Sequence, residues 1–439
     1  MLLSSRNCRG ASARAAIRTA FAGATFAWAV LLGNQARAAN WEFDPRVEVG
    51  AQYDDNYRLG PSGQKVDAYG SIADLSFIEK LIDPRYELDI SPRVRNTFLP
   101  NDHYDQSTDG FLDLNGTYHG QKWTVGGVFT YANETVISSE LLSANFGGEP
   151  LGQTTGEETG LVSFHNRRQL ERFTPNFSYD FTPRLHLRTE GQYENASFSR
   201  NILVTQSGTN LLIAQQGFKD YYAKAGLQYD FSPRYDLVSS LVGAKFLPDG
   251  SPTTTERYGL EETFEARPGQ IMQWYARLGV NQVHANTAVD GNIDKTLVVG
   301  GAGVSWTYQL SQYTADFIRD LSPSAGGAVV QHDELRGRVV KALSPRLYTI
   351  LAARYVRVRG ASQTILGIVG SDYTAASAAL QYQITRSYRI QGEYDFTWQR
   401  FQNNPASRAN SIMVSVIWQP LSKFTPIPDY NRLQPDRPQ

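Results

Sequence analysis

The most constraining feature of this sequence is a regular alternation of apolar and polar residues that recurs in many segments. In YRIQGEYDFTWQRF (residues 388–401), the even positions from Tyr388 to Trp398 are apolar or aromatic apart from one glycine, and the odd positions from Arg389 to Gln399 are polar. KDYYAKAGLQYDF (219–231) and KWTVGGVFTY (122–131) show the same split. Successive side chains of a β-strand point to opposite faces, so a period of two predicts strands with one apolar and one polar face.

The apolar faces of these segments favour a membrane barrel over a soluble β-sandwich. They carry Tyr, Trp and Phe at their ends and small or aliphatic residues between, as does a lipid-facing wall with aromatic residues at both membrane interfaces. The opposite faces carry charges along most of their length, which a water-filled lumen tolerates and a dry core does not. Segments of about 10 to 14 residues also match tilted membrane-crossing strands.

Similar proline-containing elements separate the alternating segments: IDPRY, FTPRL, FSPRY and LSPRL. Proline fixes φ and has no N–H to donate to a strand neighbour, so it belongs in a connection. The predicted short turns therefore contain Pro84 and Arg85, Pro183 and Arg184, Pro233 and Arg234, and Pro345 and Arg346. Longer stretches rich in Gly, Asn and Ser alternate with these turns. This asymmetry is typical of an outer-membrane barrel whose short turns face the periplasm.

The connections also predict the number of strands. The four Pro-Arg turns, together with ITRSY, YHGQKW, EARPGQ and YQLSQY, give eight short turns between nine longer loops. The sequence therefore predicts an all-β fold, a transmembrane antiparallel up-and-down β-barrel of about eighteen strands. Sixteen strands is the alternative count, because TGLVSFHNRRQLERF (159–173) is weakly patterned. No run after the first 38 residues approaches the roughly 18 apolar residues of a transmembrane helix.

Three parts of the chain are expected. Residues 1–38 have a positive start, an apolar core and the ending ARA, which predict a cleaved secretory signal peptide; a mitochondrial transit peptide is the competing interpretation. Residues 39–421 are the predicted outer-membrane barrel, and the prolines of residues 422–439 predict a periplasmic tail. Removing the signal leaves 42 − 5 = 37 Lys and Arg against 43 Asp and Glu, a net charge near −6. That charge argues against a nucleic-acid partner.

Polar residues at every second position of a predicted strand share one face, and we expect that face to line the lumen. The predicted pore-lining residues are Arg93, Arg95, Arg188, Arg277, Arg336, Arg338, Arg357, Arg359, Arg389, Glu190, Glu334, Glu393 and Asp395. Arg336, Arg338, Arg357 and Arg359 come from adjacent predicted strands and are expected to crowd one patch of wall. Such a cluster either sets a field that attracts anions or is neutralised by the facing carboxylates, and both hypotheses stay open. The long stretch 138–158 is a candidate loop for narrowing the lumen.

The sequence does not favour catalysis. The six histidines have no spacing typical of a metal site, and no Gly-x-Ser-x-Gly or phosphate-binding loop is present. We therefore expect no metal, no cofactor and no enzymatic activity. The expected activity is a porin-type channel for polar solutes or saccharides, in contact with outer-membrane lipid.

The repeated SPRY and TPRL turns after Tyr-x-Phe, with a first strand ending YDDNYRL (Tyr53–Leu59), resemble the β-barrel porin 2 family of Gram-negative outer-membrane proteins. The resemblance covers nearly the whole chain after the signal. It implies location in the outer membrane and, because some related barrels are associated with exopolysaccharide export, an alternative role as an export barrel working with a periplasmic partner. A third alternative is a non-conducting structural or adhesive surface barrel.

Overall fold

The computed structural model describes residues 40–60, 63, 65–100, 107–136, 166–199, 216–251, 254–269, 271–287, 291–360, 371–401 and 405–420. The expected signal peptide (1–38), the expected tail (422–439) and the candidate narrowing loop (138–158) lie outside these residues. Among the described residues, no helix is both long and apolar enough to cross a membrane.

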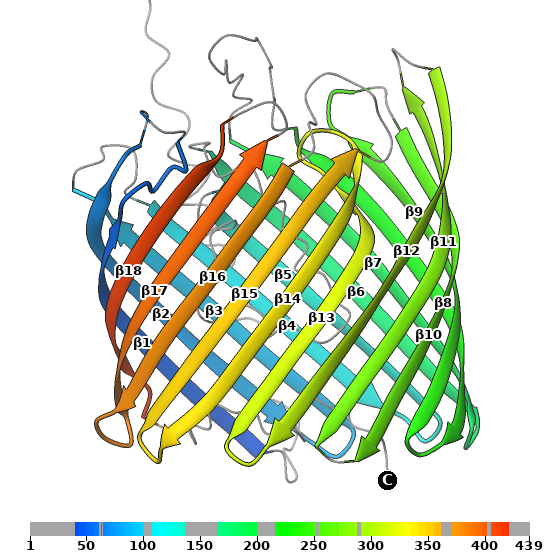
Figure 1. Cartoon of the computed structure of the whole chain (residues 1–439). Coiled ribbons are helices and arrows are strands. Elements are labelled where there is room, and N and C mark those ends of the chain that lie inside the picture. The colour runs from blue at the N-terminus through cyan, green and yellow to red at the C-terminus, as the bar shows by residue number, and fades with distance from the viewer. Residues whose placement is uncertain are drawn as a thin grey trace, which may run out of the picture.

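Eighteen antiparallel strands form one closed sheet (Figure 1). The predicted barrel fold and the count of eighteen are confirmed, and the alternative of sixteen is wrong. Neighbours in sequence are neighbours in the sheet throughout. The strands are β1 Asn40–Asp54, β2 Ala68–Ile82, β3 Tyr86–Phe98, β4 Ser107–His119, β5 Trp123–Thr135, β6 Arg167–Thr182, β7 Leu185–Phe198, β8 Phe218–Ser232, β9 Tyr235–Pro248, β10 Thr254–Gly269, β11 Met272–Thr287, β12 Gly291–Tyr308, β13 Ser311–Pro323, β14 Val329–Ser344, β15 Leu347–Gly360, β16 Ser371–Gln383, β17 Tyr388–Phe401 and β18 Ser407–Trp418.

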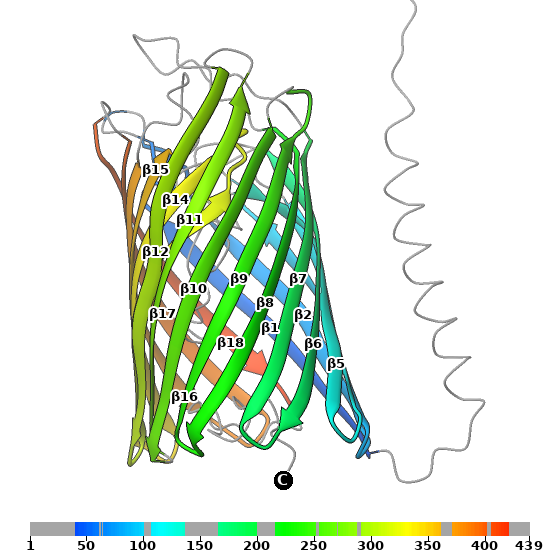
Figure 2. The same cartoon turned by 90° about the vertical axis from the view of Figure 1, so that its right-hand side faces the viewer.

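The seam between β1 and β18 closes the barrel. The two strands pair antiparallel from Val47 opposite Trp418 to Asp54 opposite Ser411, and β1 pairs with β2 along its whole length. A closed sheet has no free edge, so nearly every strand N–H and C=O finds a partner inside the protein. Figure 2 shows the strands tilted around the barrel axis, as closure requires.

All eight predicted short turns lie at one end of the barrel, here called the short-turn end, and the strand ends that the longer connections join lie at the opposite end, here called the long-loop end (Figure 1). The residue before each turn proline explains the repeated motif. Thr182 Oγ1 accepts hydrogen bonds from the amides of Arg184 and Leu185, at 3.3 and 3.0 Å. Ser344 Oγ accepts the equivalent bonds from Arg346 and Leu347. The hydroxyl thus binds amides that the tight turn leaves without a strand partner.

The predicted alternation between two faces is confirmed. On β17, Tyr394 is 44% exposed on the outer face, whereas neighbouring Glu393 is 4% exposed on the inner face. Aromatic rings collect on the outer face at the short-turn end, where Tyr118 stacks on Trp123 and Trp306 stacks on Tyr313, with ring centroids 5.3 and 5.4 Å apart. An apolar outer wall with such a band of aromatic rings is suited to lipid.

The loop between β1 and β2 differs from the expected extended strand end. β1 stops at Asp54, and Tyr57 and Leu59 turn into a buried apolar cluster with Val356 and Tyr373. Asp55 binds the side-chain and backbone nitrogens of Asn410 at 2.7 Å each. Burial opposes ionisation of Asp55, but these hydrogen bonds outweigh it and hold its pKa below the usual value.

A substitution at Gly50 tests how tightly the seam is packed. A Cβ at this position would lie 2.9 Å from both Ser415 Cβ and the Val414 carbonyl oxygen, so Gly50→Val is expected to lower the free energy of unfolding by about 1–3 kcal/mol. Urea unfolding of the barrel in lipid vesicles measures the change. Gly392→Val is the control, because a Cβ there meets no atom within 4 Å. Equal stability of the two variants would contradict a closely packed seam.

Candidate functional site on the inner face of the barrel

The strand register assigns most of the predicted pore-lining residues to the inner face. These are Arg93, Arg95, Arg188, Glu190, Arg277, Glu334, Arg336, Arg338, Arg389, Glu393 and Asp395. They share the parity of buried residues such as Ile318 and Ile417, and alternate with exposed apolar residues such as Leu278 and Leu335.

Arg357 and Arg359 are the exceptions, and their predicted inward orientation is wrong. Arg357 lies opposite Asp333, and Arg357 and Arg359 fall on the same face of β15 as outward Leu351 and Tyr355, so both arginines lie on the outer face of the strand. The arginine of this strand that faces inward is Arg354, which lies directly opposite Arg336. Residues 347–360 have apolar side chains at both odd and even positions, because the inner face of the barrel is itself apolar toward the long-loop end. The alternation therefore does not show which face points inward on this strand. The expected four-arginine patch is therefore three inner arginines: Arg336, Arg338 and Arg354.

Inner arginines are held by acidic partners. Arg354 Nε donates to Glu334 Oε1 at 2.7 Å, and both side chains are 0% exposed. Arg336 donates to both carboxylate oxygens of Asp316. In the same way Arg93 and Arg95 bind Asp74, Arg277 binds Asp320, and Arg172 binds Glu194. This pairing favours the hypothesis that the inner charges neutralise one another, because buried charges require partners.

A polar cavity of about 390 Å³ lies along the inner wall of β6–β11. Its lining includes Arg188, Glu190, Lys224, Glu265, Tyr275 and Arg277. Lys224 is bound by Glu261 at 3.0 Å, whereas Arg188 has no ion pair among the described residues. Donors and acceptors of both signs therefore face one space, an arrangement suited to polar solutes rather than to one class of ion.

The tip of the β13–β14 hairpin narrows the lumen and was not anticipated from the sequence. The tip residues Leu321, Ala325, Ala328 and Val329 are all buried. β13 stops pairing with β12 at Arg319, opposite Gly300, although β12 continues to Gly291. The hairpin leaves the wall there because its backbone binds elements several strands away.

Two hydrogen bonds hold the hairpin tip against strands on the inner side of the barrel. The Gln216 amide before β8 donates to the Ala325 carbonyl oxygen at 2.8 Å, and the Arg257 guanidinium of β10 donates to the Leu321 carbonyl oxygen. Leu321 and Val329 also join a buried apolar cluster with Phe218, Phe246 and Val299. The only sequence signal was the run of small and apolar residues at 325–330, which differs from an ordinary polar loop.

Comparison with known proteins gives likeness of fold. No protein-family model matches the chain, and no curated protein matches its sequence. Among solved structures, the outer membrane protein OpdK from Pseudomonas aeruginosa is similar, with TM-score 0.42 and 11% identity over 86% of this chain and 99% of that one. OccK3 (OpdO) of the same species aligns with TM-score 0.44 and 14% identity, over 86% and 96% of the two chains.

A larger structure, the copper transporter OprC, aligns with TM-score 0.42 and 10% identity over 82% of this chain. The alignment spans 62% of the length of OprC.

Substitution of the two neighbouring arginines of β15 tests the assignment of faces. Arg354→Met leaves Glu334 charged and buried, so we expect the free energy of unfolding to fall by about 3–5 kcal/mol. The matched change Arg357→Met removes an exposed cation and is expected to leave stability close to that of the unmodified protein. Urea unfolding in lipid vesicles measures both. A larger loss for Arg357→Met than for Arg354→Met would reverse the assignment.

Proposed function

We propose that the protein is a channel of the Gram-negative outer membrane that passes polar solutes or saccharides through its lumen. The observation that carries the proposal is the two-faced wall: apolar and aromatic outside, charged and hydrogen-bonding inside. A barrel with a polar inner face provides a path for solutes that the lipid would exclude.

The inner geometry supports small solutes. The hairpin tip and the apolar cluster around it lie toward the long-loop end, and the polar cavity of the β6–β11 wall lies nearer the short-turn end. A solute would pass a narrow apolar region and then exchange water for the mixed donors and acceptors of the cavity. Because most of the inner arginines with described partners, such as Arg277, Arg336 and Arg354, are held in ion pairs, we propose transport rather than catalysis as their role.

Export of an exopolysaccharide, which the resemblance to the β-barrel porin 2 family suggested, stays a prediction. The tail expected to meet a periplasmic partner lies outside the described residues. Deleting the gene separates the two roles: loss of secreted polymer with intact cytoplasmic synthesis supports export, and unchanged polymer opposes it.

Planar-bilayer recording tests the channel directly. The folded barrel, identified by its heat-modifiable migration on gels, should give stepwise conductance. Replacing residues 322–330 with Asn-Gly removes the hairpin tip and is expected to raise single-channel conductance, because the tip fills part of the lumen. Lys245→Gln, which removes a charge from the outer face of β9, is the control and should leave conductance unchanged. A folded barrel that never conducts would refute the channel.

A further inference from the structure

A row of alternating charge crosses the outer face of five neighbouring strands toward the long-loop end. Arg319 of β13, Asp333 of β14, Arg357 of β15, Asp372 of β16 and Arg400 of β17 lie directly opposite one another in the register. We call this set the arginine row. It contains Arg357, one of the two arginines whose predicted place in the lumen is wrong. Its position outside the barrel calls for a role other than solute selection.

The row presents arginine to the surroundings and keeps its carboxylates beneath. Arg357 and Arg400 are 42% and 54% exposed, whereas the side chain of Asp372 between them is 15% exposed. Arg357 binds Asp372 through Nε alone at 2.7 Å, and Arg400 through Nη2 alone at 2.9 Å. The carboxylate therefore orients both guanidinium groups, and each keeps N–H donors that no described residue accepts. Arg359, one step further along β15, adds a further exposed cation.

The arginine row lies at the edge of the apolar outer wall. Two residues closer to the short-turn end, the same five strands carry the register row Phe317, Leu335, Tyr355, Thr374 and Trp398. Arg357 lies over the ring of Tyr355 and Arg400 over that of Trp398, with centroid distances of 5.8 and 5.7 Å. Aromatic residues followed by arginine mark the height at which hydrocarbon gives way to charged headgroups.

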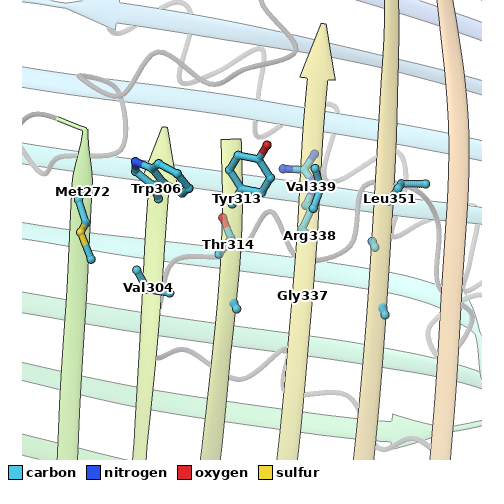
Figure 3. Close-up of a pocket in the computed structure, with 12 residues that line it drawn as sticks. Met272, Val304, Trp306, Tyr313, Thr314, Gly337, Arg338, Val339 and Leu351 are labelled. Atoms are coloured by element: carbon cyan, nitrogen blue, oxygen red, sulfur yellow. The ribbon is translucent and has the colours of Figure 1, made fainter. Parts of the chain in front are cut away.

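A groove lies further down the apolar wall, separated from the arginine row by Phe317, Leu335 and Tyr355 and extending toward the short-turn end. Ala315, Gly337 and Ala353 lie opposite one another on β13, β14 and β15, and their small side chains leave a depression of about 530 Å³. Figure 3 shows the larger side chains around it, among them Trp306, Tyr313, Val339 and Leu351. A depression in a lipid-facing wall is filled by hydrocarbon, since neither water nor a polar group is stable there.

We propose that the arginine row and the groove together bind one lipid of the outer leaflet, a phosphorylated acyl glycolipid with more than one phosphate. Arg357 and Arg400 flank one phosphate. Arg319, which Asp333 orients through Nε and Nη2, is about 10 Å from Arg357 and about 19 Å from Arg400 at about 4.8 Å per strand, and reaches a second group. One acyl chain lies in the groove beneath. This inference rests on the proposed location in the outer membrane.

The rest of the described outer wall does not offer the same combination. At the long-loop end of β9–β12, Lys245 is bound by Glu256 at 2.8 Å and His284 by Asp294, so these ion pairs contain no arginine and none shares one carboxylate between two arginines as Asp372 does. A second described depression of the outer wall, on β5–β9, is lined by apolar side chains such as Val125, Phe177 and Leu241, but the strands above it carry no row of exposed arginines. The arginine row on β13–β17 and the acyl-sized depression on β11–β15 share strands β13–β15.

Lipid retention tests the arginine row and the groove separately. The full-length barrel is placed in phosphatidylcholine nanodiscs doped with bisphosphorylated lipid A, and the lipid kept per barrel is counted by native mass spectrometry. Arg357→Gln with Arg400→Gln should lower retention about ten-fold or more, because charge-assisted hydrogen bonds are lost. Gly337→Leu should lower it by filling the groove; a Cβ there meets no atom within 4 Å, so the wall itself is undisturbed.

Matched variants distinguish a site from general attraction. Lys245→Gln removes an outer cation elsewhere, and Gly392→Leu adds the same bulk to the outer face of β17, where a Cβ also meets nothing within 4 Å. Both should retain lipid normally, and Arg357→Lys with Arg400→Lys should restore part of the loss. Monophosphoryl lipid A should bind the unmodified barrel more weakly. Inorganic phosphate alone should not displace the lipid, since it lacks the acyl chain.

Unchanged retention in both the arginine and the Gly337 variants would overturn the proposal, as would equal losses in their controls or full displacement by inorganic phosphate. Bilayer recording of the same proteins separates this outcome from the channel proposal. The arginine double variant should conduct like the unmodified barrel. A barrel that retains the lipid and never conducts leaves the lipid site standing and removes the channel.

Discussion

Pairing between β1 and β18 is the constraint on which the rest of the structure depends. Closure gives every strand two neighbours, so the backbone polar groups are satisfied without water and the wall can face hydrocarbon. Closure also places alternate side chains of each strand in two different environments, the lipid outside and the interior of the barrel. The aromatic band at Tyr118 and Trp306, the inner ion pairs and the outer arginine row are consequences of that division at different heights.

Arginine serves two physical purposes in this wall. Arg354 on the inner face is fully buried against Glu334, so each charge is compensated by the other away from water. Arg357, three residues later on the outer face, shares Asp372 with Arg400 and keeps donors free for an external anion. One strand thus stabilises the interior with one arginine and presents another to the proposed lipid site, and the face on which each residue lies decides its role.

The fold was largely predictable from the sequence because period-two alternation and turn prolines are local signals. They gave the barrel, the eight short turns and the eighteen strands. Arg357 and Arg359 were misplaced because both parities of β15 are apolar near Tyr355 and Val356, where the inner wall is buried against other inner residues. The inward hairpin tip was missed for a related reason: its contacts to Gln216 and Arg257 join residues far apart in sequence, and no local pattern reports them.

The alternation between lipid and interior along a single strand is the most direct test of this account. The chain has one cysteine, Cys8, in the expected signal peptide, so single cysteines carrying nitroxide labels can be placed in turn from Ile390 to Trp398 of β17 in the reconstituted barrel. Collision with molecular oxygen, which concentrates in hydrocarbon, is measured at each site by electron paramagnetic resonance. The account predicts high collision rates at the even positions and low rates at the odd ones. Uniform rates along the strand, or higher rates at Gln391, Glu393 and Asp395, would contradict it.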